Sequence, residues 1–240
     1  MKKIKGSGNY LKNQVRKNLA KAVFCIVLFG LIFFALSLRA LFTVSLSIFE
    51  TAGLLVSLAP LAAFYFYLHK YRIYSAGWEG EKQVAKLLSS KLSDDYLLIN
   101  DLYLQNGNGD VDHIVLGPNG VFVLETKNWS GNITCNGDEW QRPGKRNFKG
   151  SPSRQVKKNV ANIKHIIDIS PTSRSPDIWV EGIVVFTNNH SNLHLNNPTV
   201  SILKLPQLPN HITTHGSSST YAPQQLEVIV KEILKQKRGT

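Results

Sequence analysis

Two long uncharged runs dominate the hydrophobic pattern in the first third of the chain. The first covers the 17 residues Ala22–Leu38 and the second the 18 residues Thr51–Leu68. A helix rises about 1.5 Å per residue and the hydrocarbon core of a bilayer is about 30 Å thick, so both runs are at the short end of spanning length. With Ala20 and the stem of Lys21 the first run suffices. The pattern therefore predicts two transmembrane helices within residues 22–69, the second kinked at Pro60.

Two other interpretations of these runs stay open. Residues 1–40 could be a cleaved signal peptide, or the second run could be buried in a soluble domain. The first run is long for a signal peptide, and the second run follows at once. The aromatic segment Phe64–Tyr67 followed by Lys70 and Arg72 is typical of a membrane interface with a basic flank. These features favour two membrane spans.

Charge is distributed unevenly around the two runs. The chain has a net charge of +12, and residues 1–21 hold seven Lys or Arg and no acid. Lys70 and Arg72 follow the second run, whereas Arg39 is the one base among residues 39–50. The positive-inside rule then predicts a multi-pass integral protein of a bacterial inner membrane with both termini in the cytoplasm. The lipid bilayer is accordingly an expected partner.

Composition excludes two classes of protein. An apolar content of 43% is too high for a disordered chain. Cys25 and Cys135 are the two cysteines of the sequence, which excludes a disulfide scaffold and suits a cytoplasmic domain.

The remaining two thirds alternate between helical and strand-like patterns. Apolar residues at helical spacing predict helices over Trp78–Leu92, Arg154–Ile169 and Leu226–Leu234. Runs rich in branched and aromatic residues predict strands, and these runs are Tyr96–Leu104, Val111–Leu116, Val121–Lys127, Asn132–Cys135 and Trp179–Thr187. Residues 188–222 are rich in Asn, Pro and Ser and predict irregular structure with one strand near Thr199–Leu203. The order of elements predicts an α/β fold with a mixed sheet.

The patterns together predict four segments along the chain. They are a basic cytoplasmic N-terminus at 1–21, two transmembrane helices at about 22–38 and 51–68, a soluble domain at 75–190, and an irregular segment with a C-terminal amphipathic helix at 191–240.

The candidate catalytic residues lie in the most apolar predicted strands of the soluble domain. Asp112 interrupts one strand, and Glu125 and Lys127 share a face of the next because they are two residues apart. If the hairpin loop has two or four residues centred on Pro118 and Asn119, then Asp112 stands directly opposite Glu125. A three-residue loop with glycine in the left-handed conformation would instead turn the two acids to opposite faces. Turn chemistry leaves both registers open, and the cost of burying two unrelated charges favours the first.

Paired carboxylates suggest a specific reaction. Opposite Cβ atoms would be about 4.5–5.5 Å apart, close enough for both acids to hold one hard cation such as Mg²⁺ or Mn²⁺. Such a cation binds a phosphate and lowers the pKa of water, while a nearby lysine stabilises developing charge. The pattern therefore indicates phosphodiester cleavage, and a purely structural ion-pair cluster is the alternative.

Four stretches of the sequence resemble one family. They are GWEGEKQVAKLL at 77–88, VDHIVLGPNGVFVLETKNWSGNI at 111–133, SPSRQ at 151–155 and EGIVVFTN at 181–188. Together they resemble the nuclease-related domain (NERD) family, which is similar to the PD-(D/E)XK, restriction-endonuclease-like superfamily. Val111 stands where the family commonly has Ile, and Ser151 stands where Asn often precedes the proline.

The resemblance implies a restriction-endonuclease-like αβββαβ core behind the membrane helices, together with an Mg²⁺ or Mn²⁺ cofactor. It implies that Asp112, Glu125, Lys127 and Gln155 are catalytic residues. It also implies that Glu81 joins Asp112 and Glu125 as a metal ligand.

A basic stretch after these strands suggests a nucleic-acid partner. Seven bases without an acid are interleaved with Trp140 and Phe148, a composition that can follow a phosphate backbone and stack bases. The seven are Arg142, Lys145, Arg146, Lys149, Arg154, Lys157 and Lys158. A solvated face, or a face that touches anionic lipid, is the alternative.

The histidines offer weaker signals. His113 follows the strand acid and is expected to face away from it, as a core residue. His190 with His194, and His211 with His215, have a four-residue spacing that would suit a metal on a helix. Their Asn, Pro and Ser neighbours argue against a helix, so we do not expect a metal site there.

The sequence thus predicts a membrane-anchored, divalent-metal-dependent nuclease or nuclease-like nucleic-acid processing protein. The alternative is a catalytically silent membrane adaptor that uses the nuclease fold as a binding module.

Overall fold

The computed structural model of the chain divides into two compact units. One unit is Tyr10–Trp78, and the other combines Met1–Asn9 with Glu79–Thr240. Helix α2, Ile48–Lys91, contributes residues to both. The structure describes residues 1–6, 9–40, 48–104, 110–142, 150–169, 178–218 and 220–236.

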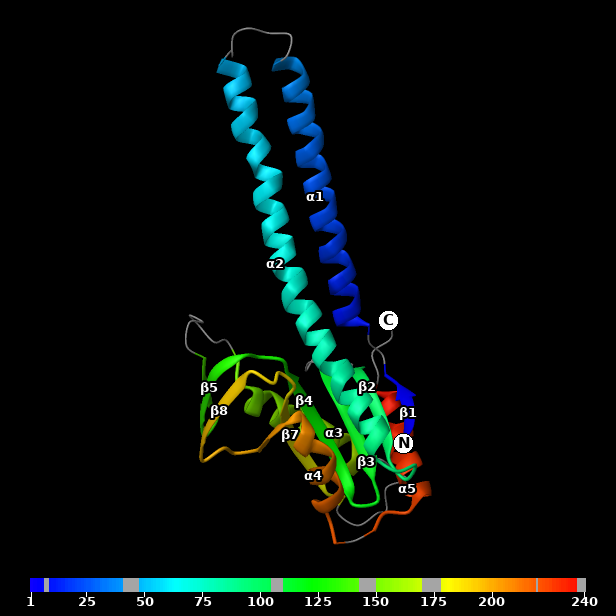
Figure 1. Cartoon of the computed structure of the whole chain (residues 1–240). Coiled ribbons are helices and arrows are strands. Elements are labelled where there is room, and N and C mark those ends of the chain that lie inside the picture. Colours follow the sequence, from blue (N-terminus) through cyan, green and yellow to red (C-terminus); the bar gives the residue numbers. More distant parts are fainter. Residues whose placement is uncertain are drawn as a thin grey trace. The chain divides into compact units, whose positions relative to one another are not determined.

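The first unit consists of α1, Tyr10–Ala40, and the first part of α2 (Figure 1). Helix α1 begins twelve residues before the first apolar run, so the basic segment ahead of that run is helical. Its buried residues lie three and four apart and form one stripe along the helix. They are Val15, Asn18, Ala22 and Cys25.

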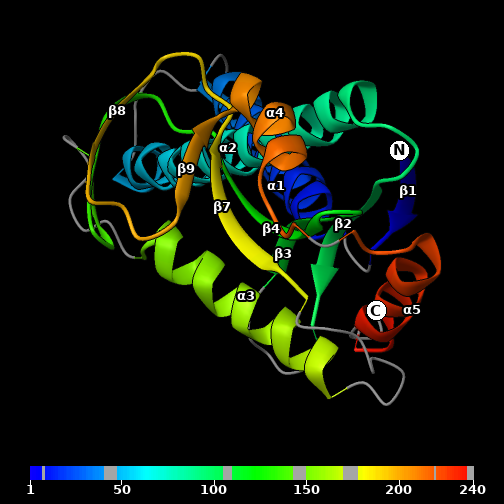
Figure 2. The same ribbon diagram turned by 90° about the horizontal axis from the view of Figure 1, so that it is seen from below.

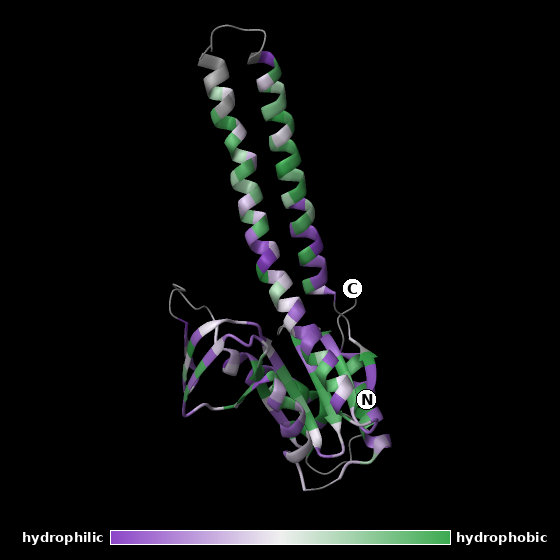
Figure 3. Cartoon of the chain, viewed as in Figure 1, coloured by the Kyte–Doolittle hydropathy of each residue, from purple (hydrophilic) through white to green (hydrophobic). Residues whose placement is uncertain are grey.

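One helix, α1 over Tyr10–Arg39, is long and apolar enough to cross a membrane, judged by length and composition among the described residues. Hydrophobic residues follow its basic first turns and continue through its second half (Figure 3). Phe24, Leu31 and Phe34 are each more than 60% exposed. The second predicted span, 51–68, lies inside α2. A pair of spans stays a prediction.

Helix α2 joins two segments that the sequence analysis treats as separate. The 44-residue helix includes both 51–68 and the helix predicted at Trp78–Leu92, with Pro60 inside it. Residues 69–76 contain no glycine or proline, so nothing in this stretch ends the helix. The segment expected to separate membrane and soluble parts is therefore helical.

The second unit is built on a six-stranded mixed sheet with strand order β1-β2-β3-β4-β7-β9. Neighbours β2–β3 and β3–β4 are antiparallel, and the other three pairs are parallel. The strands are β1 Lys2–Lys5, β2 Leu97–Tyr103, β3 Asp110–Gly117, β4 Gly120–Lys127, β7 Val180–Phe186 and β9 Ser201–Lys204. This confirms the expected α/β class with a mixed sheet.

A smaller three-stranded sheet has the order β6-β5-β8. Its strands are β5 Gly131–Asn136, β6 Glu139–Gln141 and β8 Ser191–Asn196. The other helices of this unit are α3 Pro152–Asp168, the 3₁₀ turn η1 Leu205–Gln207, α4 Leu208–Thr214 and α5 Pro223–Lys235.

Helices α3 and α4 lie on opposite faces of the main sheet (Figure 2), and each face has its own hydrophobic core. One core joins the sheet to α3, α5 and the small sheet, and includes Ile114, Val123 and Ile163. The other joins the opposite face to the end of α2 and to α4, and includes Leu88 and Leu124. Alternate residues of β3 and β4 therefore enter different cores, as strand geometry requires.

Three elements differ from the sequence analysis. The basic N-terminus contributes β1, which pairs in parallel with β2. Residues 191–196 form β8 and residues 208–214 form α4, where irregular structure is predicted. The short strand predicted near Thr199–Leu203 is present as β9.

Candidate active site

The β3–β4 hairpin has the two-residue loop. Gly117 pairs with Gly120, and the register continues to His113 opposite Leu124. Pro118 and Asn119 are therefore the loop residues, and the three-residue alternative is wrong. Gly120 has a φ of +142°, a conformation that favours glycine.

The paired positions end at His113 and Leu124, and the same register extended by one residue opposes Asp112 and Glu125 on one face of the sheet. Ile114 and Val123, two residues from each acid, belong to the core beneath α3, so both carboxylates lie on the α3 side. The backbone N–H of Thr126 donates to Asp112 Oδ2 at 2.6 Å. That bond fixes one carboxylate oxygen beside the strand that carries Glu125.

Lys127 sits among three partners. Its ammonium forms an ion pair with Glu125 and donates to Gln155 Oε1 at 3.5 Å. The ammonium also lies 5.6 Å from the centre of the Trp129 ring. Glu125 is almost fully buried, whereas the Lys127 side chain is 18% exposed. Lys127 can therefore reach both the buried acid and a ligand at the surface.

Gln155 reaches this site because of how α3 begins. Ser151 is the N-cap residue, and its hydroxyl accepts the backbone N–H of Arg154 at 3.2 Å. Pro152 occupies the first turn, where a missing N–H costs nothing. The helix thus starts beside the end of β4 and presents Gln155 from its first turn.

Glu81 approaches from α2, and Gly80 explains how. A Cβ on Gly80 would lie 2.8 Å from Thr187 Oγ1 and 3.1 Å from Asn128 Cβ. A side chain at this position would hold α2 away from the ends of the sheet strands. With glycine there, Glu81 lies within electrostatic reach of Asp112 and Glu125.

Burial raises the pKa of all three acids. Burial, followed by the negative charge of Asp112, raises the pKa of Glu81 to about 9. Burial and then Asp112 raise the pKa of Glu125 to about 8, although Lys127 opposes the change. Burial raises the pKa of Asp112 to about 6, against the lowering effect of Lys127 and of the Thr126 N–H. The cluster therefore holds more protons at neutral pH than ordinary carboxyls would.

Two further acids, Asp101 and Asp110, lie near this cluster, and the sequence pattern did not indicate them. Asp101 and Asp110 both raise the pKa of Glu81 and of Asp112. Asp101 has a φ of +52°, an uncommon conformation for a residue other than glycine, within the strand β2. The sequence feature that could have identified Asp101 is the Asn100-Asp101 pair inside an otherwise apolar run, because Asn and Asp tolerate a positive φ.

His113 lies on the opposite face of β3 from Asp112, as expected. It is 2% exposed, and its Nδ1 is 2.8 Å from Asn100 Oδ1. Burial lowers the pKa of His113 to about 3, so the ring is neutral at physiological pH. Its role is in the core behind the site.

Oxygen donors at the site suit a magnesium-like cation. Glu125 Oε2 is buried without a hydrogen-bond partner among the described residues, which leaves one acceptor directed into the cluster. No group of three or more His, Cys, Asp or Glu side chains in the described ranges is arranged to hold a metal. Mg²⁺ commonly uses one or two carboxylates and completes its shell with water and substrate phosphate, so the Asp112–Glu125 pair fits that mode.

The paired histidines belong to other elements, with His194 in β8 and His211 in α4. His211 is in α4, so its segment is helical, contrary to the sequence analysis. Its Nε2 is 2.8 Å from Glu181 Oε1, and its ring stacks on His215 with centroids 3.8 Å apart.

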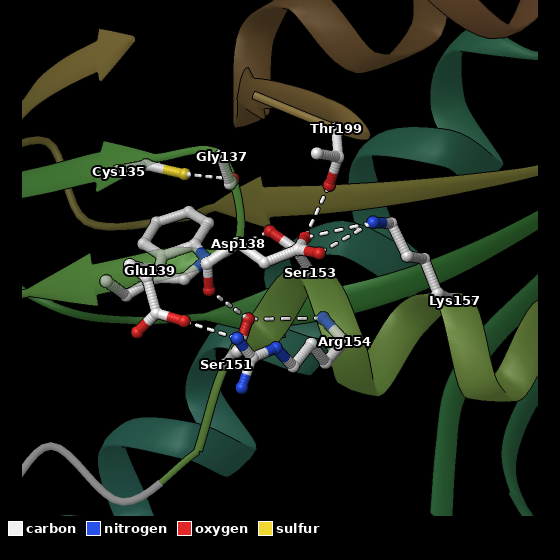
Figure 4. A network of polar contacts seen from close by, with 10 residues as sticks. Cys135, Gly137, Asp138, Glu139, Ser151, Ser153, Arg154, Lys157 and Thr199 are labelled. Carbon is white, nitrogen blue, oxygen red and sulfur yellow. Dashed lines mark hydrogen bonds and ion pairs between the residues drawn. The ribbon is translucent and has the colours of Figure 1, made fainter. Parts of the chain in front are cut away.

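Much of the basic stretch is engaged in local contacts (Figure 4). Arg154 forms an ion pair with Glu139, and Lys157 Nζ donates to both Asp138 oxygens at 2.8 and 3.0 Å. Arg142 donates to the carbonyl of Ser130 at 3.1 Å. Lys158 is exposed on α3 and makes no ion pair within the described residues. Lys145, Arg146 and Lys149 lie outside them.

Comparison with known proteins yields one curated relative. The chain is 40% identical over 58 residues to an uncharacterized Bacillus anthracis protein, pXO1-01, and the match covers 23% of this chain and 27% of the relative. The chain therefore spans about a quarter of that relative's length. No solved structure matches. Residues 76–187 match the family model described as the nuclease-related domain (NERD), which supports placing this part of the chain in the NERD family.

Proposed function

We propose that the protein is a membrane-anchored, divalent-metal-dependent phosphodiesterase that acts on nucleic acid. The observation that carries the proposal is the opposed pair Asp112 and Glu125 on one face of the sheet, with Lys127 bonded to Glu125. The match of this region to a nuclease-related family supports the same chemistry.

Each side chain of the candidate active site has a role in this proposal. Asp112 and Glu125 would hold Mg²⁺ or Mn²⁺, with Glu81 close enough to contribute through water. The cation, when bound, would polarise the phosphate and lower the pKa of a water molecule. Lys127 would donate to a phosphate oxygen that gains negative charge, and the Gln155 amide would orient the lysine.

The activity test uses the full chain in detergent micelles with single- and double-stranded DNA and RNA. We expect cleavage that requires Mg²⁺ or Mn²⁺ and is lost in Asp112→Asn. Glu227→Gln is the matched control, because Glu227 is an exposed acid on α5. Cleavage that persists in Asp112→Asn, or that needs no divalent cation, would contradict the proposal.

The proposal includes two membrane spans, within α1 and within 51–68 of α2, with both termini in the cytoplasm. Exposed apolar residues on both helices support it, among them Phe34 and Leu55. A reporter fused after Thr240 should be active in the cytoplasm, and one inserted between residues 41 and 47 should be active outside it. Equal activity of the two fusions in the same compartment would rule out the hairpin.

A silent membrane adaptor is the second candidate function. The local ion pairs of Arg154 and Lys157 favour it, because they reduce the positive charge open to a phosphate backbone. If nucleic acid is neither cleaved nor bound when Mg²⁺ or Mn²⁺ is present at millimolar concentration, the adaptor explains the fold better.

A further inference from the structure

A cavity of about 730 Å³ lies on the far flank of α3 from Gln155. The α3 residues that line it are spaced by three and four positions and form a single stripe. They are Lys157, Val160, Ala161 and Lys164. Gln155 is not on this stripe, so the cavity is separate from the carboxylate cluster. Its volume is within the range of small-molecule sites.

The edge of strand β7 faces this cavity. Strand β9 pairs with β7 from Ile183 onward, so Val180–Gly182 have no partner on β9, and all three line the cavity. Gly182 carries no side chain, and a Cβ there would lie 2.9 Å from Val160. The backbone of β7 is therefore close to the α3 wall, where it can exchange hydrogen bonds with a bound molecule.

Trp179 supplies an aromatic wall. Its side chain is 47% exposed and packs beside Gly120, where an added Cβ would lie 3.0 Å from Trp179 Cδ1. An exposed indole beside a cavity offers a stacking surface for a planar ring. The apolar stripe of Val160 and Ala161 covers part of the other side.

The walls of the cavity are held in place by contacts across the fold. The Asn119 amide donates to the carbonyls of Ile212 and His215, each at 2.5 Å, which anchors the segment Thr214–Gly216. At the other end, Asp138 joins Lys157 to Thr199 (Figure 4). The site is therefore formed before any ligand arrives.

Charge on α3 indicates an anionic ligand. Lys157 and Lys164 are seven residues apart, about two helical turns, and both line the cavity. The Lys157 ammonium also bonds Asp138, so Lys164 is the lysine that we assign to the anionic group. The acid at the site, Glu181, is bonded to Ser201 Oγ at 2.7 Å and to His211 Nε2 at 2.8 Å. These bonds hold Glu181 on the α4 side of the cavity, and Lys164 lines the α3 side.

The dimensions favour a compact ligand over a peptide. A peptide that extended the sheet would need an edge of about five or six residues. The open edge here has three residues and is closed by β9 on one side. A flat ring with an anionic group matches the volume, the aromatic wall, the strand edge and the positive charge of this cavity.

We propose that this cavity is a nucleotide-binding site distinct from the carboxylate cluster. The base stacks on Trp179 and bonds the edge of β7, and the phosphate lies near Lys164. The nucleotide could belong to a nucleic-acid strand or be free in solution. Binding here does not require that the protein cleave anything.

Isothermal titration calorimetry of the full chain in detergent micelles tests this site. The probes are AMP, UMP, ribose 5-phosphate and a short single-stranded oligothymidylate. We expect both nucleotides to bind at least about tenfold more tightly than ribose 5-phosphate, because base stacking is worth a factor of that order. Binding of the oligonucleotide without the mononucleotides would identify a strand as the source of the ligand.

Three variants locate the binding. Trp179→Leu should weaken it about tenfold, and Trp179→Phe should restore most of it. Lys164→Gln should weaken it and reduce its salt dependence, whereas Lys231→Gln, an exposed lysine of α5, should leave it unchanged. Ala161→Phe should fill the cavity with little effect on the fold, because Ala161 is exposed.

The proposal is overturned if no nucleotide or oligonucleotide binds, or if ribose 5-phosphate binds as well as AMP. It is also overturned if Ala161→Phe leaves nucleotide affinity unchanged. Nucleotide binding at this cavity does not depend on whether the wild-type chain cleaves nucleic acid or whether Asp112→Asn removes cleavage. The two proposals are therefore tested separately.

Discussion

A methyl group on Gly80 would lie 2.8 Å from the hydroxyl oxygen of Thr187, too close for a Cβ in a folded protein. Gly80 therefore lets α2 rest directly on the ends of β4 and β7. The next residue, Glu81, comes within electrostatic reach of Asp112 because of this approach. The glycine before the acid thus has a steric role in forming the carboxylate cluster.

We predict that Gly80→Ala moves α2 and disperses this cluster. The Cβ would force Thr187 or the helix to shift, which should cost about 1–3 kcal/mol in the free energy of unfolding. The affinity for Mn²⁺ should fall at the same time, because Glu81 moves away. Thermal unfolding in detergent and calorimetric titration with Mn²⁺ measure the two effects.

Gly77→Ala is the matched control, one turn earlier in the same helix. Its Cβ would meet Leu11 Cδ1 at 3.4 Å, an ordinary contact, and alanine favours the helix. Stability should stay equal or rise slightly. If Gly80→Ala behaves like Gly77→Ala, close approach at Gly80 does not form the cluster.

The carboxylate cluster should make stability depend on pH in a cation-free buffer. The pKa values of Glu81 and Glu125 are raised to about 9 and about 8, from 4.5 in the unfolded chain. Between these values the folded state binds more protons than the unfolded state, so stability falls as pH rises from about 5 to 9. The loss should be on the order of a few kcal/mol. Thermal unfolding measured across this range tests it.

Removing one charge should flatten that dependence. Glu125→Gln keeps the shape of the side chain but cannot ionise, so its unfolding temperature should fall less between pH 5 and 9. Millimolar Mg²⁺ should flatten the wild-type profile as well, since a cation favours the charged carboxylates. An unchanged slope in Glu125→Gln would show that other groups cause the pH dependence.

His113 should produce the opposite trend at acid pH. Burial lowers its pKa to about 3, compared with 6.5 when unfolded. The unfolded state then binds the extra proton between pH 6.5 and 3, so stability falls as pH drops through this range. At pH 5 the loss is about 2 kcal/mol. In the wild type this loss offsets part of the stability that the carboxylate cluster gains between pH 7 and 5, so the stability of His113→Gln should change more favourably over that range. An equal change in the two proteins would contradict this assignment.

The central hairpin could be predicted from the sequence because one physical cost decides its register. Pro118 and Asn119 suit a tight turn but leave two registers open, whereas burying Asp112 and Glu125 on unrelated faces would be costly. That cost favours the register that the structure has. Helices α3 and α5 were likewise predicted because their apolar residues are periodic and face one core.

Elements that depend on distant partners were missed. Strand β8 has polar residues on one face, and it is held by pairing with β5, where Asn192 donates to Asn132 at 3.2 Å. Strand β1 is a basic segment whose backbone pairs with β2 more than ninety residues away in sequence. Local pattern cannot reveal either pairing. The positive φ of Asp101 likewise reflects its surroundings more than its type.

Variants of Lys127 and Asp112 should distinguish residues needed for catalysis from residues needed for cation binding. Lys127→Ala should keep the affinity for Mn²⁺ within about threefold, because the ammonium is not a metal ligand, and should lower the cleavage rate by about 10²–10³. Asp112→Asn should lose both, because it removes a carboxylate that holds the cation. Lys127→Ala also leaves Glu125 without its ion-pair partner, so both variants are assayed well below their unfolding temperatures. If Lys127→Ala loses cation binding as completely as Asp112→Asn, the lysine serves to hold the cluster together. If it keeps the full rate, Lys127 has no part in the reaction.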